Sequence, residues 1–174
     1  MAAPRFVEQL NEQIDNEFGA HQQYVAIAAY YDALTMPQMA ALFYSQAIEE
    51  RDHAMMMVKY LLDADESVVI GGVDAPRCDF SNVVEPVQLA LEQEKRVTEQ
   101  INALTKTARE ESDFASDQFM QWFIKEQVEE VAKISDLLAV VSRSKDDYER
   151  IEDWVAREVQ SQGTDPTAPA VAGA

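Results

Sequence analysis

Four long stretches of the chain repeat apolar side chains every three or four residues, which is the spacing of one face of an α-helix. They extend from about residue 6 to 34, from 38 to 64, from just after Asn82 to 110, and from 113 to 143. A shorter amphipathic stretch ends near residue 160, and its apolar side comprises Tyr148, Ile151, Trp154, Val155 and Val159. The pattern predicts an all-α protein with four long helices and a short fifth one. The fifth is too short to be stable alone in water, so it must pack on something.

The connections predict how these helices are arranged. Pro37 ends the first helix, because a residue before proline disfavours the helical conformation, and the short turn makes the second helix antiparallel to the first. Residues 65–82 contain Gly71, Gly72 and Pro76 and are long for a helix connection. About 18 extended residues reach roughly 60 Å, whereas a helix of about 27 residues is only about 40 Å long. We therefore expect a four-helix bundle with one long crossover between helices 2 and 3, which carries at most a little strand-like pairing.

Short polar side chains mark the expected helix starts. Asn82 with Glu85 has the pattern of an N-cap and its reciprocal partner, and Pro86 is tolerated in a first turn. Ser112 is expected to cap the fourth helix, and Ser144 with Asp147 the fifth.

Each long helix carries one glutamate inside its apolar stripe, where a leucine or isoleucine would be expected. These residues are Glu17, Glu50, Glu94 and Glu130. Measured from the hairpin turns, their levels agree within about four residues, or roughly 6 Å, so a bundle places them in one interior layer. His53 lies one helical turn from Glu50, and Gln127 lies one turn from Glu130, which puts both side chains beside that layer.

Four buried carboxylates need compensation, because burying one unpaired carboxylate costs several kcal/mol. No lysine or arginine occupies the four stripes at that level, so either the acids take up protons or cations neutralise them. Four carboxylates and one imidazole match two divalent ions with bridging carboxylates between them. Oxygen-rich coordination with one imidazole suits Fe, Mn or Zn better than Cu(I). We therefore expect a dinuclear metal centre, with Gln127 beside it and positions left open for O₂ chemistry.

Four further residues lie near this expected centre. Tyr24, two turns beyond Glu17, is either a hydrogen-bonding or electron-donating partner of the centre or a packed core tyrosine. Three acids lie one position off the stripes and form either a third, looser cation position or a solvated acidic face; they are Glu49, Glu126 and Glu129.

Charge and composition limit the kinds of molecule that this chain is expected to bind. The chain has 32 acidic and 14 basic residues and a net charge of -18, which argues against a nucleic acid partner and suits attraction of cations. No apolar run approaches the roughly 20 residues that span a bilayer, and the N-terminus has no signal-peptide core. A single cysteine, Cys78, excludes an internal disulfide and a four-cysteine metal centre. A cytoplasmic location without a membrane partner fits these features best.

The joint pattern of these residues resembles that of bacterial non-haem ferritins over roughly residues 6–160. The residues that carry the resemblance are Glu17, Tyr24, Glu49, Glu50, His53, Glu94, Glu126, Gln127, Glu129 and Glu130. The resemblance implies a ferritin-like fold and a hollow homo-oligomer of 24 subunits. In such a shell, Fe²⁺ is oxidised by O₂ or peroxide at a ferroxidase centre and stored as ferric oxyhydroxide. Copies of the fifth helix would then pack together at a four-fold axis.

The resemblance also implies a role for each group. Glu17 and His53 would serve the first of two irons per subunit, Glu94 and Glu130 the second, and Glu50 would bridge them. The three edge acids would form a possible third iron site. No haem is expected, because Arg51 follows Glu50 where a bacterioferritin has its haem-ligating methionine.

Two other functions fit the same helices. A small di-metal oxygenase or oxidase would be a monomer or dimer with an organic substrate pocket, and a non-catalytic scaffold would bind iron without consuming O₂. The fifth helix and the three edge acids favour storage. Residues 1–160 are expected to form one ferritin-like domain, and residues 161–174 a disordered low-complexity tail that could dock a protein partner.

Overall fold

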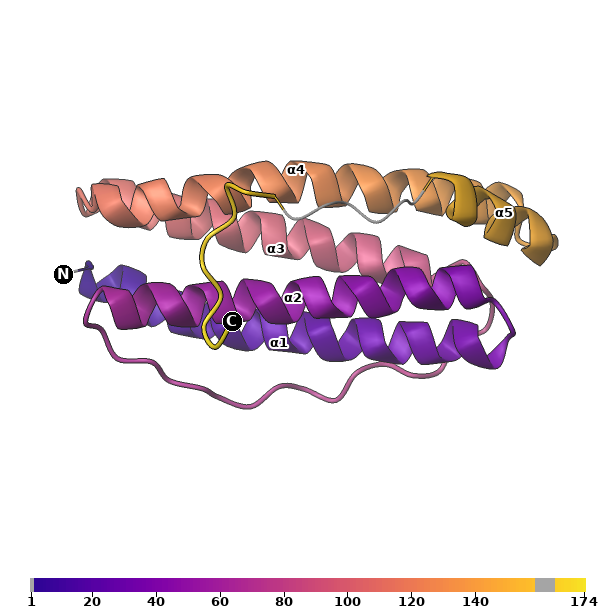
Figure 1. Ribbon diagram of the computed structural model, residues 1–174, viewed down its shortest axis with the longest axis horizontal. Coiled ribbons are helices and arrows are strands. Elements are labelled where there is room, and N and C mark those ends of the chain that lie inside the picture. The colour runs from indigo at the N-terminus through magenta and orange to yellow at the C-terminus, as the bar shows by residue number, and fades with distance from the viewer. Residues whose placement is uncertain (1, 159–164) are drawn as a thin grey trace.

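The computed structural model describes residues 2–158 and 165–174, and over these residues it contains helices and no strand. Four long helices lie side by side, and a short fifth helix lies at one end of them (Figure 1). The helices are α1 (Pro4–Ala33), α2 (Pro37–Asp63), α3 (Glu85–Glu110), α4 (Phe114–Arg143) and α5 (Tyr148–Glu158). The predicted all-α, four-helix bundle is confirmed. The predicted end of the fifth helix at residues 159–160 lies outside the described residues.

Three of the long helices end in the same way. Thr35, Asp65 and Ser112 follow α1, α2 and α3 and have positive φ angles of 59°, 58° and 57°. The next residue then donates its backbone N–H to a carbonyl five residues back, as Met36 does to Tyr31 at 3.0 Å. This is the Schellman arrangement, which usually places glycine at the left-handed position. The three ends therefore lack the residue that normally signals them in a sequence.

Two of the expected N-caps differ in the structure. Ser112 ends α3, so the cap of α4 moves to Asp113, whose carboxylate accepts the N–H of Ser116 at 3.1 Å. At α5, Asp147 rather than Ser144 accepts the N–H of Arg150, also at 3.1 Å. Before α3 the side chain of Asn82 accepts the backbone N–H groups of Val84 and Glu85, although the helix begins at Glu85 and its N-cap position is Val84. In the first two cases the serine is already used in ending the preceding helix.

The long crossover between α2 and α3 runs beside α1 along the length of the bundle (Figure 1). Side chains of α1, rather than a second strand, satisfy its backbone. Asn11 accepts the N–H of Val69 at 2.7 Å and donates to the carbonyl of Ser67 at 3.1 Å. Gln23 exchanges two bonds of 2.8 Å with the backbone of Arg77. These polar residues of one helix face thus hold the crossover against the bundle, in agreement with the expectation of little or no strand pairing.

Replacing Asn11 with alanine is expected to lower the stability of the fold by about 1 kcal/mol. Two backbone groups of the crossover would lose their hydrogen bonds to Asn11 and bond to water instead. For a chain of this size that corresponds to about 2–4 °C in the unfolding midpoint. The amide of Val69 should also exchange its hydrogen faster. Glu12→Ala is the matched control, since Glu12 is an exposed neighbour on the same helix. Equal midpoints and exchange rates in the two variants would contradict this role for Asn11.

The apolar interior consists of two clusters. The α5-end cluster contains Tyr31, Met39, Val87, Leu137 and Ile151, and the far-end cluster contains Phe6, Leu10, Leu61, Leu104 and Met120, among others. On every long helix the glutamate of the stripe lies between residues of the two clusters, as Glu50 does between Ala47 and Ala54. The bundle therefore has a polar layer at mid-height with apolar packing on both sides.

The short helix α5 packs on its own chain. Ile151 and Val155 are buried in the α5-end cluster, and the carboxylate of Glu152 accepts the N–H groups of Gln38 and Met39 at 2.8 and 2.9 Å. Glu152 thereby caps the first turn of α2, where backbone N–H groups have no helical partner. Contact with copies of α5 is not needed to cover these two apolar side chains.

The end of the chain contacts the bundle over residues 165–174, and residues 161–164 lie outside the described residues, so the disordered tail expected over 161–174 stays a prediction. Asp165 accepts the indole N–H of Trp122 at 3.2 Å, and Ala172 donates its N–H to the carbonyl of Met55 at 3.2 Å. Ala168 and Val171 pack against the far-end cluster. Small apolar residues and one aspartate are therefore enough to fix this segment across α4 and α2 (Figure 1).

Candidate metal centre

The polar layer brings together the acids that the sequence singled out. Glu17, Glu50 and Glu94 each expose 1% of their surface, Glu130 3% and His53 5%. They come from all four long helices, with Glu50 and His53 one turn apart on α2. Gln127 and Tyr24 are buried beside them, at 4% and 0% exposure. The helical periodicity that buries the apolar stripes also buries these polar groups.

One half of the layer is a compact group of three. Glu17, Glu50 and His53 each present one ligand atom, and these three atoms lie within 4.8 Å of one another. His53 Nδ1 lies 3.4 Å from Glu50 Oε2 and 4.0 Å from Glu17 Oε2. The rings of Trp122 and Phe123 pack steeply inclined to the imidazole and restrict its orientation. Two carboxylates and one imidazole at this spacing can hold a divalent transition-metal ion.

The other half of the layer is built around Glu94. The hydroxyl of Tyr24 donates to Glu94 Oε1, and Gln127 donates an N–H to Glu94 Oε2 at 3.5 Å. Gln127 is itself fixed, because Thr98 donates its hydroxyl to the amide oxygen at 2.9 Å. Tyr24 is therefore a hydrogen-bonding partner of the layer and also a member of the α5-end cluster. Both alternatives that the sequence left open for Tyr24 describe part of its environment.

Three carboxylate oxygens of the layer have no hydrogen-bond partner although they are buried. They are Glu17 Oε2, Glu50 Oε1 and Glu130 Oε2. Buried acceptors are rarely left without a partner, because each loses its hydration without compensation. Three such oxygens on three helices fit the ligand set of bound cations.

Burial and mutual repulsion make these acids hold protons more tightly than usual. Burial, with the charge of Glu50 next in importance, raises the pKa of Glu17 from 4.5 to about 8. Burial also raises the pKa of Glu130 from 4.5 to about 7, although Lys133 opposes the shift. The pKa of Glu50 is raised well above its usual value and that of Glu94 is raised, in both cases mainly by burial. Near pH 7 the layer therefore binds either protons or metal cations.

The three edge acids surround an opening to the layer. A hollow of about 530 Å³ is lined by Glu49, Glu126 and Glu129 together with His53, Trp122 and the tail residue Asp165. Burial raises the pKa of Glu126. Each of the other two lies near a lysine, since Lys133 is 3.8 Å from Glu49 and Lys125 is 3.7 Å from Glu129. The three acids thus line the opening from solvent to His53, and a nearby lysine partly neutralises the charge of Glu49 and of Glu129.

Lys133 reaches the layer although no basic residue occupies the stripes themselves. Its ammonium lies 3.5 Å from Glu130 Oε1. Lys133 is three residues after Glu130, just outside the apolar stripe, but its long side chain reaches back one turn. Stripe positions alone therefore do not reveal this ion pair.

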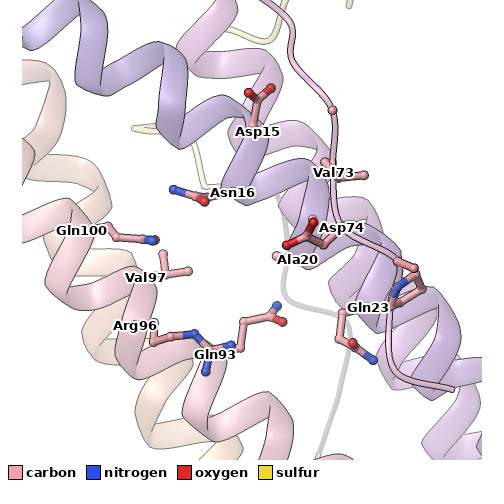
Figure 2. A pocket seen from close by; sticks show the side chains of 14 residues that line it. Asp15, Asn16, Ala20, Gln23, Val73, Asp74, Gln93, Arg96, Val97 and Gln100 are labelled. Atoms are coloured by element: carbon pink, nitrogen blue, oxygen red, sulfur yellow. The ribbon is translucent and has the colours of Figure 1, made fainter. Parts of the chain in front are cut away.

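Two further residues that the sequence analysis did not single out also support the layer. Gln13 donates to Glu17 Oε1 at 2.8 Å and lies within 3.3 Å of Gln100 Oε1. Asn16 and Gln100 line a hollow of about 340 Å³ between α1, α3 and the crossover (Figure 2). Thr98 supports the layer indirectly, because its hydroxyl donates to the amide oxygen of Gln127. Gln13 is four residues before Glu17 and Thr98 is four after Glu94, so a search for polar residues one turn from each glutamate would have found both.

Fold and site together define a class of protein: a four-helix bundle with a buried carboxylate–histidine layer suited to metal ions. A family model described as the ferritin-like domain matches residues 7–144. The chain belongs to the ferritin family, and this membership supports iron storage as its role.

Individual relatives agree with this assignment. The chain is 50% identical over 169 residues to a protein of Mycolicibacterium smegmatis named Ferritin BfrB, covering 97% of this chain and 93% of that one. It is 35% identical over 147 residues to a bacterial non-heme ferritin of Staphylococcus aureus, covering 84% and 89%. Among solved structures, an open pore ferritin from Archaeoglobus fulgidus superposes with a TM-score of 0.86 at 28% identity, covering 90% and 96%. None of the helices within residues 2–158 and 165–174 has the length and hydrophobicity needed to cross a membrane.

Proposed function

We propose that this chain stores iron in a hollow homo-oligomer of 24 copies, a closed symmetric assembly of one chain. Fe²⁺ is the substrate; it is oxidised at the polar layer and deposited inside as ferric oxyhydroxide. The observation that carries the proposal is the compact group of Glu17, Glu50 and His53, whose ligand atoms lie within 4.8 Å of one another. Its buried carboxylate oxygens without hydrogen-bond partners include Glu17 Oε2 and Glu50 Oε1.

Each layer residue has a role in this proposal. Glu17 and His53 bind the first Fe²⁺, Glu94 and Glu130 bind the second, and Glu50 lies between the two positions. Each Fe²⁺ gives up one electron, and the pair of electrons reduces O₂ to peroxide with uptake of two protons, or peroxide to two hydroxide ions. Tyr24 and Gln127 hold Glu94 in place through their hydrogen bonds, so they set the geometry of the second position.

The edge acids guide Fe²⁺ to the layer. Glu49, Glu126 and Glu129 line the hollow that reaches His53, and acids along such an opening raise the local concentration of cations. Consistent with the net charge of -18, the partners are metal ions and further copies of the chain rather than nucleic acid. The site of action in this proposal is the cytoplasm, and no haem takes part.

The experiment that tests the proposal is light scattering after size exclusion, before and after anaerobic Fe²⁺ loading and exposure to air. We expect a particle of about 470 kDa, which is 24 chains of 19.6 kDa, because identical chains close into symmetric assemblies through a small set of repeated interfaces. After exposure to air it should retain far more than two irons per chain. A monomer or dimer that retains about two irons per chain and consumes O₂ would instead identify a small di-metal oxidase.

A further inference from the structure

Lys133 of α4 lies between an acid of the layer and an acid of its edge. Its ammonium is 3.5 Å from Glu130 Oε1 and 3.8 Å from Glu49 Oε2. The Lys133 side chain is 21% exposed, so the ammonium retains limited access to solvent. Its two partners belong to different helices, since Glu49 is on α2 and Glu130 on α4.

No other lysine or arginine in the described part of the chain forms an ion pair with the layer. The ion pairs of Glu17 and Glu50 involve only His53. Lys125, two turns before Lys133 on the same helix, pairs with Glu129 and Asp165 and does not reach the layer. Lys133 therefore brings one positive charge to the edge of the site, between Glu49 and Glu130.

A third metal ion at this edge would need the same oxygens that Lys133 now contacts. Glu49 and Glu130 are the acids that face each other across the edge through Lys133. A metal ion placed between them would lie about 4 Å or less from the ammonium, where two positive charges repel strongly in a partly buried site. Either the ammonium of Lys133 moves away from the two acids, or the metal ion does not bind tightly between them.

We propose that Lys133 occupies the position between Glu49 and Glu130 that a third metal ion would take, and thereby limits tight metal binding to two ions per chain. This inference rests on the metal centre of the proposed function and adds to it a residue that sets the number of bound ions. The flexible four-carbon stem lets the ammonium swing toward the hollow when an ion passes. Fe²⁺ can thus move through this edge without being retained there.

The test replaces Lys133 with methionine in the assembled protein and counts bound Zn²⁺ by isothermal titration. Zn²⁺ is used because it does not change oxidation state. We expect two tightly bound Zn²⁺ per wild-type chain and three per K133M chain, the third at least tenfold tighter than any third ion of the wild type. Lys133→Arg retains the charge and should bind two, as the wild type does. Lys133→Gln provides a second neutral variant if K133M does not assemble.

Lys125→Met is the matched control, because it removes a positive charge from the same helix beside Glu129 without a contact to the layer. It should bind two ions. A third ion in K125M as tight as that in K133M would overturn the proposal, since the effect would then be one of general charge. Two ions in both the wild type and K133M would overturn the role of Lys133 and leave the metal centre in place. No tight Zn²⁺ in the wild type would overturn the metal centre itself.

Discussion

Glu50→Gln is expected to lower the initial rate of Fe²⁺ oxidation by at least about 100-fold, more than the loss of a residue that only supports a metal ligand. Glu50 lies within ligand distance of Glu17 and His53. Burial and the charge of Glu94, in the other half of the layer, raise the pKa of Glu50. In the proposed function it is the acid that lies between the two metal positions. Glutamine has nearly the same volume, so packing is preserved while the anionic oxygens are lost.

The rate is measured by the absorbance of ferric products and by O₂ consumption immediately after Fe²⁺ is added. Glu92→Gln is the matched control, since Glu92 is an exposed acid on α3 only two residues from Glu94. It should retain the wild-type rate. If E50Q oxidises Fe²⁺ as fast as E92Q does, Glu50 is not part of the centre.

The metal-free protein is expected to lose several kcal/mol of stability between pH 5 and pH 8.5. The pKa values of Glu17 and Glu130 are raised from 4.5 to about 8 and about 7, so at intermediate pH the folded chain binds more protons than the unfolded one. The free energy of unfolding then falls as pH rises, by at most about 1.4 kcal/mol per pH unit for each group. The stabilisation is fully present below pH 4.5 and is lost as pH rises through 7 and 8.

Thermal unfolding at one fixed protein concentration measures this trend, and the midpoint should fall by about 10 °C over the range. The double variant Glu17→Gln/Glu130→Gln should show a clearly smaller fall, because neither glutamine titrates. Saturation with Zn²⁺ should reverse the slope, since protons then compete with a bound ion. An identical pH slope in the wild type and the double variant would show that other groups cause the trend.

The helices and the layer were predictable because both follow from one periodicity. A stripe repeats every three or four residues, so a glutamate within it, such as Glu94, must face the interior whatever its neighbours are. The hairpin turns then fix its height. The long crossover was predictable from its length alone, since only a segment of that reach can start α3 at the same end as α2.

The remaining details depend on side-chain reach and on contacts between segments far apart in the sequence. Lys133 lies outside the stripe by position but enters the layer through its length. Asp165 belongs to a stretch of low complexity, whose composition does not predict that this residue hydrogen-bonds to Trp122 of α4. Ser112 was expected to begin a helix and instead ends one, because serine can adopt the left-handed conformation when a three-residue turn requires it.

The two apolar clusters have a consequence for how this chain can change over evolutionary time. With the exception of Tyr24, the residues of the polar layer are not members of either cluster. Substitutions that alter metal chemistry therefore leave most of the packing that holds the helices together intact. Changes in packing away from the layer leave the ligands in place, whereas Phe123, which packs against His53, belongs to both environments. Removing a buried acid would even relieve repulsion, so drift toward inactive, more stable chains meets no folding barrier. Selection on iron handling, rather than on the fold, must therefore maintain the four glutamates.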